Sequence, residues 1–168
     1  MNKSLSTDEV QSLVPECKVL TYPEFMRYDS LKELLAPYNC VIFLYMTTEN
    51  YGHYCAIWKN QNGVLHFFDP YGVYLDDQLN FIPAQKNREL GQEVKHLSEL
   101  IIKDKSIRTI FVNHYPFQKR KQGINTCGRH VAVRVLLRHL SEDAYQKLFK
   151  NKDADKAVVK ITDHLAGP

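Results

Sequence analysis

Three strand-like runs in the first half of the chain restrict its fold more than any other feature. Residues 40–46 form a continuous apolar run, and residues 54–58 and 64–68 are shorter runs rich in aromatic and β-branched side chains. The last two are joined by residues 60–63, whose sequence Asn-Gln-Asn-Gly favours a tight turn. We therefore expect residues 54–58 and 64–68 to form a hairpin within a central sheet.

Segments with helical periodicity lie on either side of these runs. Apolar residues recur at helical spacing across residues 87–103, which predicts one surface helix with a buried face. Residues 127 to about 140 are apolar on nearly all sides, which predicts a central helix packed against the sheet. Shorter helices are expected to begin at Ser6, Ser30 and Ser141, because serine is a favoured N-cap residue.

The remaining pattern completes the predicted architecture. Residues 107–112 read as a further strand, and the stretch after residue 151 is charged and weakly periodic. No repeat, low-complexity tract or linker divides the chain, and 168 residues suit one domain. We expect an α+β fold, a small mixed central sheet flanked by helices, in a single domain over residues 1–168.

Composition excludes several classes of protein. A hydrophobic content of 44% with 24% charged residues is ordinary for a globular protein, and the apolar runs are too short to span a bilayer. The N-terminus lacks the apolar core of a secretory signal, so we expect a protein that is neither secreted nor membrane-bound. In that setting the four cysteines, Cys17, Cys40, Cys55 and Cys127, are expected to be reduced.

Cys127 is the first candidate for chemistry. It opens the predicted central helix within the sequence Asn-Thr-Cys-Gly-Arg-His at residues 125–130. The unpaired N–H groups and positive dipole end of a helix start favour an anion and lower a cysteine pKa. A thiol at this position is therefore a candidate nucleophile.

The sequence also offers the partners that a catalytic thiol requires. These are a base, a group that orients the base, and donors for the oxyanion. His53 is the expected base and Asp69 the expected orienting group, because the predicted hairpin brings the ends of their strands together. For the oxyanion we expect the backbone N–H of Cys127 and a glutamine side chain, either Gln118 or Gln122, with Gln118 favoured because it follows the strand at residues 107–112 in an aromatic-Pro-aromatic context.

These residues together resemble the adenovirus-protease and SUMO-protease clan of cysteine peptidases. The resemblance covers about residues 41–140 and includes Gly-His at 52–53, Phe-Asp-Pro-Tyr-Gly at 68–72 and Thr-Cys-Gly-Arg-His at 126–130. The version Asn-His-Tyr-Pro-Phe-Gln at 113–118, followed by Asn-Thr-Cys-Gly-Arg-His-Val at 125–131, looks most like capsid-maturation proteases of virophages, polinton-type elements and large DNA viruses. Many clan members place the glutamine six or seven residues before the cysteine, whereas Gln118 lies nine before and Gln122 five before.

The resemblance implies a function and a setting. It implies a thiol endopeptidase that matures capsid or other structural precursors at small-residue sites of the Gly-Gly type, in the virion or the host cytoplasm. The alternative that it leaves open is an isopeptidase that removes ubiquitin or SUMO. We expect a protein substrate, no cofactor and no metal, and a monomer.

Two hypotheses of other classes compete with this one. Cys127 and His130 are spaced as neighbours on a helix, and His53 and Cys55 alternate on a strand, so the four residues form a candidate zinc site. Their spacing matches no common zinc module, and a bound metal would quench the thiolate. The second hypothesis, a non-enzymatic module that binds a ubiquitin-like protein, leaves the His, Asp and Cys unexplained.

The basic cluster Lys119, Arg120 and Lys121 directly precedes the cysteine loop. Its simplest interpretation is a solvated loop, since the net charge of +3 is mild. A weak contact with nucleic acid or an acidic partner is the alternative.

Overall fold

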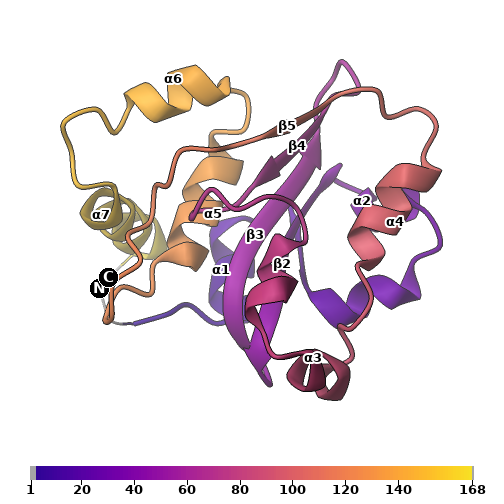
Figure 1. The fold of residues 1–168 in the computed structure, drawn as a ribbon. Helices are drawn as coiled ribbons and strands as arrows, with labels where there is room; N and C mark the ends of the chain where they lie inside the picture. Colours follow the sequence, from indigo (N-terminus) through magenta and orange to yellow (C-terminus); the bar gives the residue numbers. More distant parts are fainter. Residues whose placement is uncertain (1–2, 168) are drawn as a thin grey trace.

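The computed structural model describes residues 3–167 and contains one five-stranded mixed sheet between two layers of helices (Figure 1). The strands are β1 (Lys18–Thr21), β2 (Cys40–Thr48), β3 (Tyr51–Lys59), β4 (Leu65–Phe68) and β5 (Ile110–Val112). They lie in the order β1-β2-β3-β4-β5, with parallel pairing at both edges and antiparallel pairing in the centre. The predicted α+β class and the hairpin of β3 and β4 are confirmed.

Helices cover both faces of the sheet. The α-helices are α1 (Thr7–Leu13), α2 (Leu31–Leu35), α3 (Ala84–Leu90), α4 (His96–Lys103), α5 (Cys127–Leu136), α6 (Glu142–Lys147) and α7 (Ala154–Ala166), and the 3-10 helices are η1 (Tyr22–Arg27) and η2 (Asp77–Phe81). In Figure 1, α1, α5 and α7 lie on one side of the sheet and α2 and α4 on the other.

The two faces of β2 fill two separate hydrophobic clusters. Ile42 and Leu44 pack into the cluster with α5, whereas Val41, Phe43 and Tyr45 pack into the cluster with α2 and α4. A strand buried on both faces needs apolar side chains at every position, not at alternate positions. This explains the continuous apolar run at residues 40–46.

The predicted single helix over residues 87–103 is wrong, because the chain forms α3 and α4 with a break between them. Gly91 ends α3 with a φ of +76°, a left-handed conformation that glycine adopts without steric cost. The next side chain, Gln92, is buried and accepts a hydrogen bond from the backbone N–H of Met46. That contact turns the chain toward β2 and leaves Val94 exposed.

Other boundaries also differ from expectation. The helix that opens at Cys127 ends at Leu136, not near residue 140, and the buried Arg134 guanidinium donates to the carbonyls of Leu137 and Leu140 beyond it. The weakly periodic C-terminal stretch forms α7, which is capped by the Asp153 side chain. The helices expected at Ser6, Ser30 and Ser141 are confirmed, each with the serine hydroxyl accepting from the backbone N–H three residues later.

Candidate active site

The hairpin brings His53 and Asp69 together at one end of the sheet. His53 is near the start of β3, Asp69 directly follows β4, and the two strands are antiparallel. His53 Nε2 lies 2.7 Å from Asp69 Oδ1, and Asp69 is fully buried. Burial lowers the pKa of His53, but the charge and hydrogen bond of Asp69, together with Cys127, raise it to about 10. The imidazole is therefore held as a cation at neutral pH.

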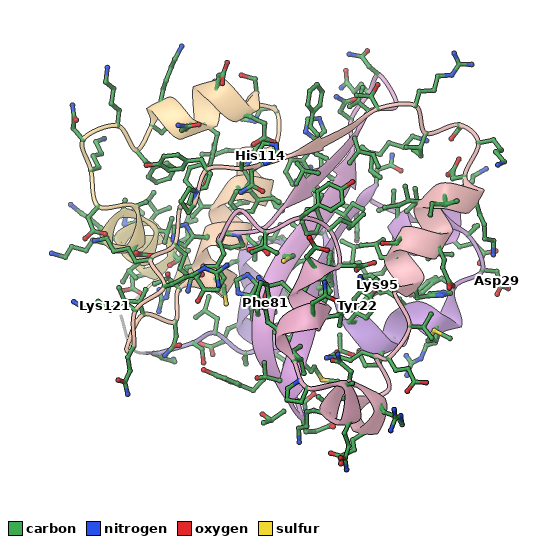
Figure 2. The ribbon with its side chains drawn as sticks, in the orientation of Figure 1. Tyr22, Asp29, Phe81, Lys95, His114 and Lys121 are labelled. Carbon is green, nitrogen blue, oxygen red and sulfur yellow. The ribbon has the colours of Figure 1, made fainter. Side chains whose placement is uncertain are left out.

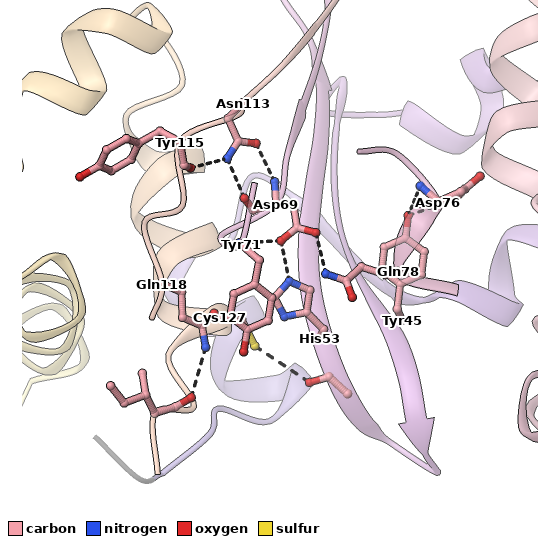
Figure 3. A network of polar contacts seen from close by, with 12 residues as sticks. Tyr45, His53, Asp69, Tyr71, Asp76, Gln78, Asn113, Tyr115, Gln118 and Cys127 are labelled. Carbon is pink, nitrogen blue, oxygen red and sulfur yellow. Dashed lines mark hydrogen bonds and ion pairs between the residues drawn. The ribbon is translucent and has the colours of Figure 1, made fainter. Parts of the chain in front are cut away.

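Four hydrogen bonds from three residues fix the position of Asp69, besides its contact with the imidazole. The Gln78 side chain donates to Oδ2 at 2.9 Å, and the backbone N–H of Tyr71 donates to Oδ1 at 2.7 Å. The Asn113 side chain accepts from the Asp69 N–H at 2.9 Å and donates to the Asp69 carbonyl at 2.6 Å. These contacts leave the carboxylate little freedom to turn away from His53 (Figure 3).

Cys127 is the first residue of α5, as predicted, and faces the other side of the imidazole. Figure 3 shows His53 between Asp69 and Cys127. Burial raises the pKa of the Cys127 thiol, but the hydrogen bond and charge of His53 and the backbone N–H groups of Tyr54 and Gly128 lower it below its ordinary value. The arrangement favours a thiolate beside an imidazolium, which is the reactive form of a catalytic cysteine.

A single carbonyl links the Asp69 turn to the glutamine loop. The Pro70 carbonyl accepts hydrogen bonds from the N–H groups of Phe117 and Gln118 at 2.9 and 3.0 Å. Gln118 is buried, and its amide donates to the carbonyl of Ile124 at 3.3 Å, so one N–H is used for orientation and a second remains. Gln122 is exposed. The structure thus places Gln118 at the site, as favoured from the sequence; its role as oxyanion donor stays a prediction.

The basic loop lies over the outer side of His53. The Tyr71 ring stacks on the His53 ring at 4.5 Å and 7°, and the Arg120 guanidinium lies 4.5 Å above the Tyr71 ring. Lys119 forms an ion pair with Asp153 at 3.0 Å, and Lys121 is exposed (Figure 2). Two of the three cations are therefore held by the protein itself. The expected nucleic-acid contact stays a prediction.

A narrow hollow of about 220 Å³ adjoins Cys127. The segment before α1 forms part of its wall, because Leu5 lines it and the Tyr54 hydroxyl donates to the Leu5 carbonyl at 3.2 Å. A Cβ added to Gly128 would lie 3.2 Å from the Tyr54 ring. A larger residue after Cys127 would require the Tyr54 ring to shift by a few tenths of an ångström.

The candidate zinc residues divide into two groups. Among residues 3–167, donor atoms of His53, Cys55 and Asp69 lie within 4.8 Å of one another, close enough to hold a metal ion. A metal there would separate His53 from Asp69. His130 instead contacts Asp155, with Nε2 2.9 Å from Oδ1.

Three residues of the site had no role in the sequence-based prediction. Asn113 belongs to the quoted motif at residues 113–118, and its motif position was the signal that could have found it. Gln78 and Asp155 carry no comparable signal, because they lie far in sequence from the groups they contact.

Comparisons with known proteins bear on the family and the fold. No family model matches the chain. The uncharacterized protein V9 of Sputnik virophage is 32% identical over 140 residues, which cover 83% of this chain and 79% of V9. The chain belongs to the V9 family.

Solved structures place this family among known folds. The ASFV pS273R protease superposes with a TM-score of 0.54 and 13% identity, covering 98% of this chain and 68% of the protease chain. The V9-family chain therefore has the fold of this protease. The central domain of an uncharacterized Legionella pneumophila protein, Lpg1148, matches 99% of both chains at 14% identity and a TM-score of 0.47, which is too distant to carry a conclusion. Across residues 3–167, the helices are too short or too polar to cross a membrane.

Proposed function

We propose that the protein is a cysteine endopeptidase that processes the capsid or other structural precursors of its own virus or mobile element. The observation that carries this proposal is the order Asp69, His53, Cys127 in space, with the imidazole bonded to the carboxylate at 2.7 Å and the pKa of the thiol lowered. The fold shared with a protease and the virophage relative support it.

In this proposal the Cys127 thiolate attacks the carbonyl carbon of the scissile peptide bond, and the carbonyl electron pair moves onto oxygen. The N–H of Cys127 and the Gln118 amide donate to that oxyanion. The His53 imidazolium gives its proton to the leaving amine as the C–N bond breaks, which leaves a thioester on Cys127. Neutral His53 then takes a proton from water, whose oxygen attacks the thioester and releases the acid and the thiolate.

The choice of substrate rests on two supports. The first is the relative in Sputnik virophage. The second is the hollow of about 220 Å³ beside Cys127, walled by Leu5, Leu44 and Tyr54, which favours small residues beside the scissile bond. We propose action in the virion or in the host cytoplasm where particles assemble.

The decisive experiment compares substrates side by side. Purified protein is incubated with the recombinant capsid precursor of its virus, with ubiquitin and SUMO fluorogenic substrates, and with a peptide library scanned for Gly-Gly sites. We expect cleavage of the precursor at discrete small-residue sites by wild type and none by Cys127→Ala. Efficient cleavage of a ubiquitin or SUMO conjugate with no cut in the precursor would replace this proposal with the isopeptidase alternative.

A further inference from the structure

A buried carboxylate outside the triad joins both arms of the loop that carries the catalytic groups. Asp155 lies in the first turn of α7 and is fully buried. Its Oδ1 accepts from the Thr126 hydroxyl at 2.7 Å and from His130 Nε2 at 2.9 Å, and its Oδ2 accepts from the backbone N–H of Lys119 at 3.2 Å. All three donors belong to the loop or to α5.

The two contacts to the loop lie beside the two oxyanion donors. Lys119 directly follows Gln118, and Thr126 directly precedes Cys127. Asp155 therefore holds residues 119 and 126 to one carboxylate, as a clamp across the loop between them. Movement of either arm relative to the other would break one of these hydrogen bonds.

The same contact changes the start of α5. Thr126 occupies the N-cap position, yet its side chain makes no capping hydrogen bond, and its hydroxyl instead donates to Asp155. A threonine at this position ordinarily accepts from the N–H groups of the first turn. Because the Thr126 side chain does not cap the helix, the N–H groups of the first turn of α5 are free to stabilise the Cys127 thiolate. The Gly128 N–H is one of the groups that lower the pKa of the Cys127 thiol.

His130 holds the carboxylate from the side of α5. Burial lowers the pKa of His130 below its ordinary value although Asp155 raises it, so the ring is neutral at pH 7 and donates through Nε2. Burial raises the pKa of Asp155, but the hydrogen bonds from His130, Thr126 and Lys119 lower it below its ordinary value. Asp155 is thus a buried anion satisfied by hydrogen bonds from one loop and one helix.

We propose that Asp155 is a positioning residue that keeps the Gln118 amide and the Cys127 N–H aimed at one oxyanion. The proposal rests on the proposed function for the reaction that it serves. Asp155 acts through Lys119 and Thr126 and touches no reacting atom.

Asp155→Asn is the first test. An asparagine keeps the shape but presents an N–H₂ group where a donor already stands, so at least one contact is lost. We expect kcat on a cleavable peptide to fall about 10- to 100-fold with KM changed less than about threefold, since an oxyanion contact forms only in the transition state. The exchange rate of the Lys119 backbone amide, measured by NMR, should rise at least about tenfold because its acceptor is gone.

Thr162→Val is the matched control. Thr162 is buried on the same helix and accepts from Arg129 on α5 at 2.7 Å, so its loss also removes a hydrogen bond between α5 and α7. It should lower the melting temperature about as much as Asp155→Asn while leaving kcat and the Lys119 exchange rate near wild type. Equal effects of both variants on kcat and exchange would mean that Asp155 is only structural, and would overturn the proposal.

Thr126 provides a second route if Asp155→Asn folds poorly. Thr126→Val removes the hydroxyl and should lower kcat, whereas Thr126→Ser keeps it and should retain activity. If Asp155 acts through Thr126, the double variant should lose less than the product of the two single losses. Independent, multiplicative losses would contradict that link.

The failures can be told apart. A wild-type protein that cleaves no peptide would defeat the proposed function, while the exchange of the Lys119 amide would still show whether Asp155 fixes the loop. Normal exchange in Asp155→Asn would defeat the positioning proposal even in an active protease.

Discussion

The two halves of the candidate site are held in different ways. His53 and Asp69 stand on one hairpin, sixteen residues apart, and bond to each other directly, while Gln78 and Asn113 hold Asp69 from outside the hairpin. Cys127 and Gln118 stand on a helix and a loop that depend on Asp155, a residue of the C-terminal helix. Residues that are placed by a local element, such as a hairpin, can be predicted from the sequence. Residues that are positioned by contacts with distant segments cannot.

The largest expected effect tests the point where both halves meet. Cys127→Ala should reduce peptide cleavage by at least about 10⁴-fold, because no other group can form the thioester. An alkylating agent at neutral pH should modify Cys127 well before the other cysteines, since the thiolate is the reacting form and burial raises the pKa of Cys17 and Cys55.

Cys17→Ala, far from the site, is the control and should keep activity. Uniform alkylation of all four cysteines, or an active Cys127→Ala, would remove the thiol from the mechanism.

The helix half is tested next. Gln118→Ala should lower kcat about 100- to 1000-fold with little change in KM, because the amide contacts the oxyanion only in the transition state. Gln122→Ala, in the same loop but exposed, should be close to wild type. The reverse result would show that the loop rearranges when substrate binds and that Gln122 is the donor.

The hairpin half has an equivalent support residue in Gln78. Gln78→Leu removes the donor to Asp69 Oδ2 and leaves a buried carboxylate oxygen without that partner. A hydrogen bond to a charged group contributes about 1.5–3 kcal/mol, so we expect kcat to fall about 10- to 100-fold. Asn80→Ala, exposed in the same 3-10 helix, serves as the control. An unchanged kcat would mean that Tyr71 and Asn113 hold Asp69 by themselves.

The extent to which the fold and the site could be predicted from the sequence also differs between local and distant contacts. The hairpin was predictable because residues 60–63 have turn-forming side chains and the flanking strands are apolar. The sequence points to Cys127, His53 and Asp69 as candidates because a helix start and a hairpin place them by local rules, and the structure brings them together; their catalytic roles stay predictions. The fold class followed from the same segments.

The parts that escaped prediction lack such local signals. The β1 strand has only four residues, and α7 buries the polar Asp155 and Thr162 beside Val158, so its apolar periodicity is weak. Gly91 breaks the predicted helix because Gln92 turns inward to β2, a tertiary contact that no local pattern encodes. Gln78 and Asp155 are polar residues whose partners lie nine or more residues away.

The pH dependence measures the coupling between the two halves. The lowered pKa of Cys127 means that the thiolate forms below the ordinary thiol value of 9.0, and the raised pKa of His53 means that the imidazolium persists to about 10. The value of kcat/KM should therefore rise at a pH below 9, reach a plateau and fall near pH 10. Within the plateau kcat/KM should vary by less than about tenfold. A kcat/KM profile that continues to rise through pH 9 would show that His53 does not stabilise the thiolate.

The smallest expected effect concerns Lys121, the exposed cation of the basic loop. Lys119 is paired with Asp153 and Arg120 lies over Tyr71, so Lys121 is the residue of the three whose charge is most available to a partner. If Lys121 attracts an acidic precursor or nucleic acid, cleavage of the precursor should fall several-fold between about 50 and 200 mM salt. Cleavage of a short neutral peptide should change little, because salt weakens the charge attraction that brings enzyme and precursor together and leaves the chemical step unaffected. Lys121→Ala should remove that salt dependence, whereas Lys32→Ala, exposed on the opposite layer of helices, should retain it. Equal salt dependence in both variants would mean that the basic loop contacts only solvent. The helix half of the site would then contribute to catalysis and not to substrate attraction.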